Sequence, residues 1–226
     1  MHYSPALSDH PSLQRLFSPE ARQFFMGIYN NLLLAAGDSR LKSLLICASN
    51  PGEGTTTAAI GLALTVAAVQ SGPVLLIDGN FANPQVCKAF NEPELPGLGD
   101  LIAGTTDIKG AIQTTTVPHL QIMGAGAPPL DYVSILEPPF FKDLLQRLSG
   151  DYGFIIIDGA SLNMFPESVL YAAQVARVFL VVQAGVTRVQ VVANALTRLN
   201  VGGCDQVDLV LNRRAFPIPS WIYKRL

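Results

Sequence analysis

The chain has 226 residues, of which 49% are hydrophobic and 14% are charged. This balance excludes an extended disordered protein and predicts one α/β domain with a large buried core. The formal net charge is −2, and no long basic run occurs, which argues against a general nucleic-acid binder. We therefore expect no nucleic-acid partner.

The cysteines and the first residues favour a cytoplasmic protein. Cys47, Cys87 and Cys204 are scattered without metal-ligand spacing, as is usual in a reducing compartment. Residues 1–5 lack the basic and apolar regions with which a signal peptide begins. The most apolar stretch, 58–69, is too short to cross a bilayer and instead predicts a buried helix.

The chain begins with a segment of low core content. Residues 1–17 contain prolines and small polar side chains, and we expect a flexible arm. The run Ser-Pro-Glu at 18–20 then predicts a helix start, and apolar spacing carries this helix to about residue 36. An apolar strand is predicted at 43–48.

A glycine-bearing turn follows this strand and precedes a long apolar helix predicted over 58–70. The turn reads Ser49-Asn50-Pro51-Gly52-Glu53-Gly54-Thr55-Thr56-Thr57. Strand, turn and helix together form a cradle of backbone N–H groups at a helix N-terminus, where a nucleotide phosphate binds. We expect ATP or ADP to be bound by Pro51, Gly52, Glu53, Gly54, Thr55, Thr56 and Thr57.

The turn departs from the usual pattern G-x-x-x-x-G-K-[ST]. Thr55 stands at the lysine, and Thr56 stands at the hydroxyl that normally reaches magnesium. Losing the lysine removes a charge-assisted hydrogen bond of about 1.5–3 kcal/mol, and the transition state loses more. The pattern predicts weak nucleotide binding and poor hydrolysis; the alternative is a loop kept for structure alone.

Two further strands end in an acid. Asp78 follows the apolar run 74–77, and Asp158 follows the run 154–157. A carboxylate at the C-terminal end of a parallel strand lies beside the phosphate crevice. We predict that Asp78 and Asp158 are catalytic and that they hold magnesium together with Thr56. For Asp78, the alternative is a helix cap or turn former.

The remaining elements complete an alternating pattern. Strands are predicted at 120–123, 178–182 and 207–211, and helices over 84–90, 98–103, 108–113, 140–148 and about 188–199. Alternating strands and helices predict an α/β fold, with a doubly wound, mostly parallel sheet and helices on both faces. The domain then covers 18–212.

The tail, 213–226, mixes basic and aromatic residues. Arg213, Arg214 and Lys224 lie among Trp221 and Tyr223. Such a segment can seat against a membrane surface or an acidic partner. The alternative is a tail packed on its own domain.

With these residues placed, 18–212 resembles the bacterial tyrosine kinase family, the cytoplasmic domains of capsule and exopolysaccharide co-polymerases. This family lies within the MinD/ParA group of P-loop ATPases. The resemblance rests on Pro51-Gly52-Glu53-Gly54, Leu75-Leu76-Ile77-Asp78, Asn83-Pro84, Pro96-Gly97-Leu98, Gly124-Ala125-Gly126, Asp151-Tyr152, Ile155-Ile156-Ile157-Asp158 and Val210-Leu211-Asn212-Arg213.

The resemblance assigns a role to each matching position. The backbone of 52–56 would surround the phosphates, and Thr56 would reach magnesium. Asp78 would help to activate the attacking hydroxyl, and Asp158 would position the metal. Asn212 would lie near the adenine.

Several family features are missing. Thr55 replaces the lysine, Asn80 replaces the second acid of an Asp-x-Asp pair, and Ala82 stands where a basic residue is common. Gly-Ala-Ser at 159–161 replaces Thr-Pro-Pro. The oligomerisation motif expected near Arg22 is absent, and Tyr223 is the single tyrosine of the tail.

These losses remove the positive charge that contacts the phosphates, one metal ligand, the motif for ring assembly and the tyrosines that serve as the protein's own substrate. They therefore favour a pseudo-kinase that regulates capsule or exopolysaccharide biosynthesis or export. The implied partner is a membrane co-polymerase, a kinase paralogue or another copy of the chain. This places the protein at the inner face of the membrane. Two alternatives stay open. One is an active kinase using Lys42, Lys88, Arg40 or a neighbour's arginine, and the other a MinD/ParA-like positioning ATPase held by its tail.

Overall fold

The computed structural model describes residues 16, 18–36, 43–129, 138–165 and 167–214. One seven-stranded sheet organises this part of the chain, in the order β3-β4-β2-β5-β1-β6-β7. Its strands are β1 (Ser43–Ala48), β2 (Val74–Asp78), β3 (Ile112–Thr114), β4 (Leu120–Met123), β5 (Phe154–Ser161), β6 (Arg177–Gln183) and β7 (Val207–Asn212). Neighbouring strands are parallel except for β3 and β4, which confirms the mostly parallel, doubly wound sheet.

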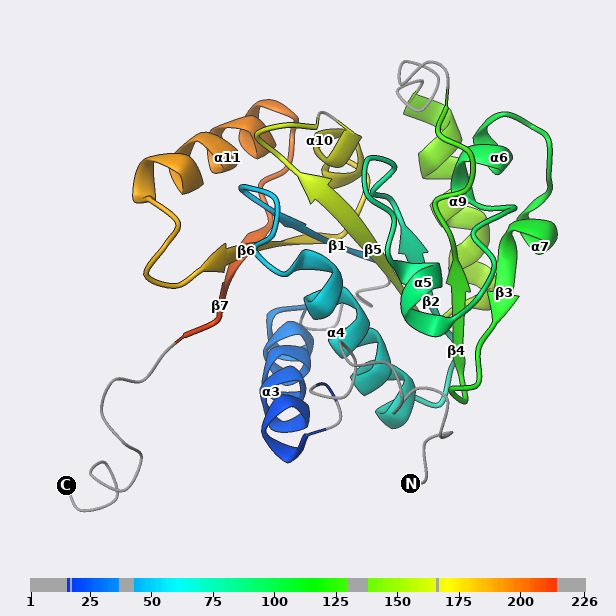
Figure 1. Cartoon of the computed structure of the whole chain (residues 1–226), viewed down its shortest axis with the longest axis horizontal. Helices are drawn as coiled ribbons and strands as arrows, with labels where there is room; N and C mark the ends of the chain where they lie inside the picture. Colours follow the sequence, from blue (N-terminus) through cyan, green and yellow to red (C-terminus); the bar gives the residue numbers. More distant parts are fainter. Residues whose placement is uncertain (1–15, 17, 37–42, 130–137, 166, 215–226) are drawn as a thin grey trace.

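Helices cover both faces of the sheet (Figure 1). One face carries α3 (Pro19–Ala36), α4 (Thr55–Val69) and α5 (Val86–Phe90). The other carries α6 (Leu98–Ile102), α7 (Ile108–Ala111), α9 (Pro138–Asp151), α10 (Glu167–Ala172) and α11 (Val189–Val201).

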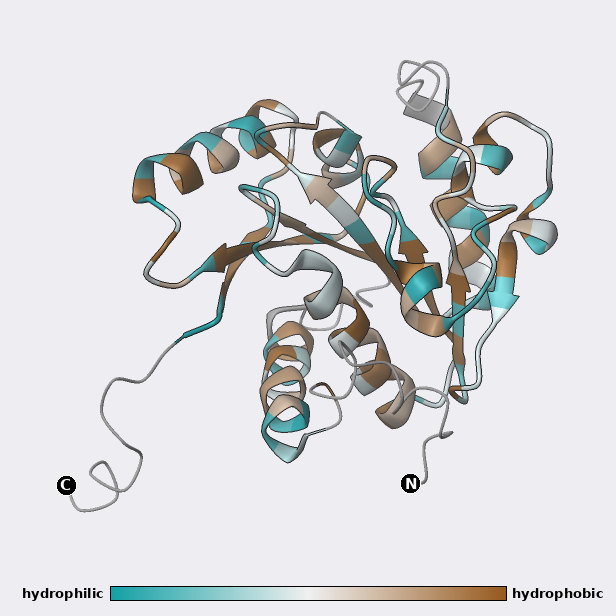
Figure 2. Cartoon of the chain, in the orientation of Figure 1, coloured by the Kyte–Doolittle hydropathy of each residue, from teal (hydrophilic) through white to brown (hydrophobic). Residues whose placement is uncertain are grey.

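The strands separate two apolar cores. In β1, Leu44 and Ile46 pack toward α4, whereas Leu45 and Cys47 pack toward the opposite helices. Successive side chains of a strand point to opposite faces, so a strand covered on both sides must be apolar throughout. Figure 2 shows this as hydrophobic strands enclosed between helices whose outer sides are more polar.

The structure differs from the sequence prediction at several elements, and α4, β3 and α10 show the physical reasons. Helix α4 begins at Thr55 instead of 58, because the threonines form its first turn although they lack apolar side chains. The helix predicted over 108–113 ends at Ala111, and Ile112–Thr114 pairs antiparallel with β4 as β3. Helix α10 was not predicted, since its buried Glu167 and Ser168 interrupt the apolar pattern.

The chain ends lie largely outside the described residues. Of the arm predicted over 1–17, the structure describes Leu16, which is 8% exposed and packs in the core beside α3 and α4. The tail prediction falls mostly on 215–226, which is also outside. Within the described ranges, no helix combines the length and apolarity that a membrane span requires.

Candidate nucleotide-binding site

A pocket of about 370 Å³ lies at the edge of the sheet where the parallel strands end. Segments from four places in the chain line it: the turn after β1, the turn after β2, the end of β5 with the loop that follows, and the residue after β7. The lining residues are Asn50, Pro51, Gly52, Gly54, Thr55, Thr56, Thr57, Asn80, Ala82, Asn83, Gly159, Ser161, Met164, Phe165 and Arg213. This is the edge at which doubly wound folds bind ligands.

Two glycines shape the turn after β1. Gly52 has φ +81° and Gly54 has φ +98°, left-handed conformations that side chains disfavour. A Cβ on Gly54 would also collide with the side-chain amide of Asn212. Helix α4 begins at the next residue, so its N-terminal N–H groups and partial positive charge meet the pocket. The turn therefore has the backbone geometry expected of a phosphate cradle, and phosphate binding by it stays a prediction.

Glu53 holds this turn from behind. Its side chain is 4% exposed, and one carboxylate oxygen accepts hydrogen bonds from the backbone N–H groups of Ser49 (2.9 Å) and Asn50 (3.1 Å). The other oxygen accepts from the Thr187 hydroxyl at 2.5 Å. The Asn212 amide donates to the Glu53 carbonyl at 2.8 Å. Glu53 and Asn212 thus support the loop without lining the pocket.

Asp78 is fully buried and already engaged by the backbone. Its carboxylate accepts hydrogen bonds from the N–H groups of Asn80 (3.1 Å), Gln85 (2.9 Å) and Val86 (2.9 Å). Burial raises the pKa of Asp78 to about 6, while these hydrogen bonds oppose the rise and Glu94 adds slightly to it. The contacts are those of a turn former and helix cap, and the predicted metal and catalytic roles of Asp78 remain predictions.

Asp158 lies opposite Asp78 in the pairing of β2 with β5. It is fully buried, and within the described residues neither carboxylate oxygen has a hydrogen-bond partner. Burial and then the Asp78 charge raise the pKa of Asp158 well above its usual value. The Thr56 hydroxyl, which is close to the carboxyl group but outside hydrogen-bond geometry, opposes this in part. An unsatisfied buried carboxylate requires an explanation, and a role as a cation ligand is one.

Comparison with known proteins identifies the relatives of this chain. No family model matches it. CapB of Staphylococcus aureus is 29% identical over 190 residues, which cover 84% of this chain and 82% of CapB. The tyrosine-protein kinase CpsD of Streptococcus agalactiae is 25% identical over 196 residues, covering 86% and 84%. The homologues of this chain are bacterial tyrosine-protein kinases.

Solved structures give the same relationship. The chimerical protein CapA2B2 superposes with a TM-score of 0.82 at 25% identity, over 96% of this chain and 93% of that one. The septum site-determining protein MinD of Pyrococcus horikoshii, complexed with Mg-ADP, superposes with a TM-score of 0.63 at 20% identity. The match covers 81% of this chain and 76% of that one. The fold is therefore that of the tyrosine kinase domains and of MinD-like P-loop ATPases, as the sequence resemblance implies.

Positions that differ from the kinase family meet in the pocket. Thr55, Asn80 and Ala82, together with Gly159 and Ser161, all line it. Neutral groups thus occupy the places where the family pattern has a lysine and an acid. The departures at the loop, after β2 and in β5 therefore fall on one site, whereas Arg22 does not line it and Tyr223 lies outside the described residues.

Sequence reasoning missed several pocket residues, of which Arg213 matters most. We assigned it to the tail, but it lines the pocket beside the loop. Arg213 comes just after the last predicted strand. Because parallel strands end at the same edge of a sheet, where ligands bind, this position is a signal that predicts a place near the site. Met164 and Phe165 were missed because no motif marks the loop after β5.

Of the substitute cations suggested by the sequence, the structure describes Lys88, which does not line this pocket. Lys88 forms an ion pair with Glu94 at 3.3 Å. Arg40 and Lys42 lie outside the described residues. Among the described lining residues, Arg213 is the cationic one.

Proposed function

We propose that this chain is a degenerate tyrosine-kinase-like protein that regulates capsule or exopolysaccharide biosynthesis or export, with weak or no ATP turnover. The observation that carries the proposal is a glycine turn that lines the pocket at the N-terminus of α4, with Thr55 in place of the lysine. Backbone N–H groups suffice to hold a phosphate. Stabilising the charge of a transition state also requires a positively charged side chain, and the loop does not supply one.

The acid groups support the same proposal. A general base must come within hydrogen-bond reach of the proton it removes. Asp78 is fully buried, does not line the pocket and accepts hydrogen bonds from three backbone N–H groups. Asn80, which lines the pocket, has an amide where the family has a carboxylate. Among the described residues, no carboxylate lines the pocket to serve as a base for phosphoryl transfer to tyrosine.

The site still fits magnesium. Mg²⁺ prefers oxygen ligands and is usually held by one or two protein groups together with waters and phosphates. Thr56 would provide a hydroxyl at the pocket. The Asp158 carboxylate, which has no described hydrogen-bond partner, lies close enough to Thr56 for the hydroxyl to lower its pKa. Bound Mg²⁺ would neutralise phosphate charge. We propose that Mg-ATP or Mg-ADP is the ligand.

An active tyrosine kinase that uses a substitute cation is the second candidate. The observation in its favour is Arg213, which lines the same pocket as Thr55. An arginine from another part of a protein can supply charge to a transferred phosphoryl group.

The proposed partner is a membrane polysaccharide co-polymerase or a competent kinase paralogue. Support comes from the kinase homologues and from the likeness to the CapA2B2 chimera, which covers 96% of this chain. Self-association with another copy is a further possibility for testing. Through such a partner the protein would act at the inner face of the membrane.

The test measures binding of a fluorescent ATP analogue with Mg²⁺, and phosphate transfer to tyrosine, for the wild-type chain and Thr55→Lys. We expect weak wild-type binding without transfer. Thr55→Lys should tighten binding about tenfold, because it restores a charge-assisted hydrogen bond. Gln190→Lys, which adds the same charge on an exposed residue of α11, should leave binding unchanged.

Rapid tyrosine phosphorylation by the wild-type chain would overturn the pseudo-kinase proposal in favour of the second candidate. A contaminating kinase is recognised with Thr56→Val. This change removes the proposed magnesium hydroxyl, so transfer that persists in the variant does not come from this site.

A further inference from the structure

We propose that Arg213 supplies the cation that the loop lacks, and that its guanidinium holds the outer phosphates of the bound nucleotide from its position beside the loop. The inference rests on the proposed nucleotide binding at this site. It adds a phosphate-binding residue that lies outside the loop motif and far from it in sequence.

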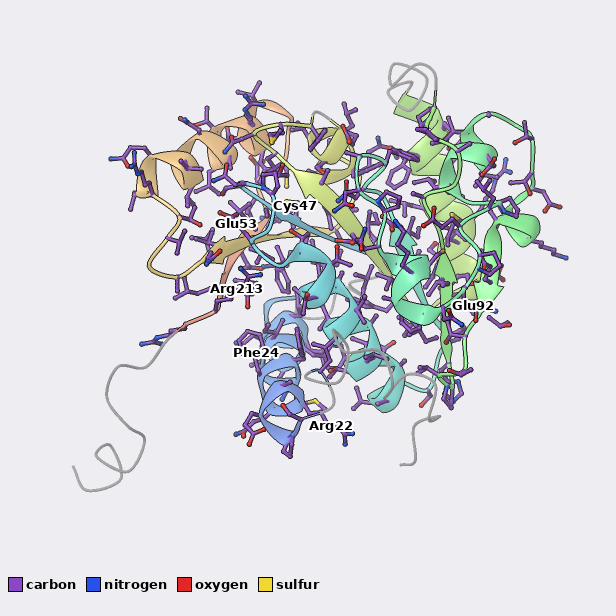
Figure 3. All side chains as sticks on the ribbon, in the orientation of Figure 1. Arg22, Phe24, Cys47, Glu53, Glu92 and Arg213 are labelled. Atoms are coloured by element: carbon purple, nitrogen blue, oxygen red, sulfur yellow. The ribbon has the colours of Figure 1, made fainter. Side chains whose placement is uncertain are left out.

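The position of Arg213 is the first support. It follows β7 directly and lines the pocket together with Gly54, Thr55 and Thr56. Figure 3 shows Arg213 at the end of β7, with Glu53 on the neighbouring turn. The residue therefore borders the pocket into which the phosphates of a loop-bound nucleotide would extend.

The backbone of Arg213 is tied to the loop. Its φ of +54° is left-handed, which is uncommon for a residue with a side chain. Its N–H donates to the Asn212 side-chain oxygen at 2.8 Å, and the Asn212 amide nitrogen donates to the Glu53 carbonyl at 2.8 Å. One asparagine thus fixes the arginine backbone relative to the phosphate cradle.

The guanidinium itself is available. Its described contact is a long hydrogen bond to the neutral Gln183 side chain at 3.3 Å, and the residue is exposed. By contrast, Arg177 is committed to Asp208 at 2.6 Å. A guanidinium offers a planar fork of N–H donors that matches phosphate oxygens in pairs, so an uncommitted one at a phosphate cradle suits this ligand.

The charge around the pocket also favours an anion. None of its described lining residues is acidic. Asp78 and Asp158 are both fully buried and do not line it. No lining carboxylate therefore competes with phosphate for Arg213.

The experiment measures the affinities of ATP, adenosine and inorganic tripolyphosphate, each with Mg²⁺, for the wild-type chain, Arg213→Gln and Arg214→Gln. We expect Arg213→Gln to weaken ATP and tripolyphosphate about tenfold and to leave adenosine unchanged, because a charge-assisted contact is lost. Arg214→Gln is the matched control: it removes an equal charge from the next residue, which does not line the pocket. It should change affinity less than twofold.

A rescue variant tests substitution for the lysine directly. In the Arg213→Gln background, Thr55→Lys should restore most of the lost tripolyphosphate affinity, since both side chains would serve the same phosphates. Thermal unfolding of each variant checks that the fold is retained.

The other outcomes separate the two proposals. If the wild-type chain binds ATP and Arg213→Gln leaves tripolyphosphate affinity unchanged, this inference is wrong and nucleotide binding stands. An equal loss of adenosine and ATP affinity would show that Arg213 contacts the base, which also overturns it. Failure of the wild-type chain to bind ATP or tripolyphosphate at millimolar concentration would overturn both.

Discussion

At the scale of single residues, the buried pair Asp78 and Asp158 dominates the electrostatics of the site. Folding raises the pKa of both carboxyl groups, so the folded protein binds their protons more tightly than the unfolded chain does. The stability that this provides is present below the unfolded pKa of about 4. It is lost as the pH rises, for Asp78 through a pKa of about 6.

We therefore predict that Asp158→Asn stabilises the protein at pH 7 in the absence of ligand. The variant removes a carboxyl group whose ionised form is disfavoured by burial and by the Asp78 charge, and whose oxygens have no hydrogen-bond partner among the described residues. The expected gain is on the order of 1–3 kcal/mol, or several degrees in Tm, because an unsatisfied buried charged group costs at least that much.

Thermal unfolding from pH 4 to pH 8 checks this. The advantage of Asp158→Asn should shrink toward pH 4, where wild-type Asp158 is protonated. Asp205→Asn, on an exposed acid, should show no such trend. Added Mg²⁺ should raise the Tm of the wild-type chain more than that of Asp158→Asn. A gain that is independent of pH would contradict the explanation.

At the scale of elements, the packing of α3 against α4 depends on a small residue in the middle of α4. A Cβ on Gly61 would collide with the ring of Phe25, which is 6% exposed and belongs to the core under α3. Glycine weakens an isolated helix, so its presence here reflects close helix packing. This packing supports α4, whose first turn lines the pocket.

We predict that Gly61→Ala destabilises the protein by about 1–3 kcal/mol, although alanine has the higher helix propensity, because overpacking a core forces neighbours to move. Gly27→Ala in α3 is the matched control. A Cβ there meets no atom within 4 Å, so this variant should gain about 0.5–1 kcal/mol. Urea unfolding of both variants measures the difference, and a stabilised Gly61→Ala would show that the Phe25 ring yields freely.

At the scale of the whole molecule, the strand order places four distant segments around one pocket. The turn after β1 lies beside those after β2 and β5, while Arg213 arrives from β7 at the sheet edge. The Glu53 carboxylate joins the loop to Thr187, 134 positions away. Ligand binding at the loop should therefore stabilise all of these segments together.

We predict that Mg-ATP slows amide hydrogen exchange at 50–57, at 80–83, at 159–165 and at Arg213 in a single concentration-dependent step. Ligand that binds the folded state alone stabilises each segment it contacts. Helix α9, which does not line the pocket, serves as the internal control and should gain no local protection. Protection confined to 50–57 would mean that the ligand contacts the loop alone.

The sequence by itself determined the alternating elements, the doubly wound sheet, the glycine turn and its missing lysine. These follow from local causes: apolar runs, helical spacing, glycine at left-handed positions and acids at strand ends. The sequence prediction is wrong where the hydropathy of a residue does not match its burial. Helix α10 is an example, because its Glu167 is polar yet only 1% exposed.

Only the tertiary structure decided which distant groups meet. It showed that the hydrogen bonds of Asp78 go to the backbone after its own strand, and that the Asp158 oxygens have no described partner. It also showed that Arg213, which the sequence places in the tail, lines the pocket. The reason is physical: hydropathy and turn preferences act over a few residues, whereas the partner of a buried or pocket-lining group is set by how strands far apart in the chain pair side by side.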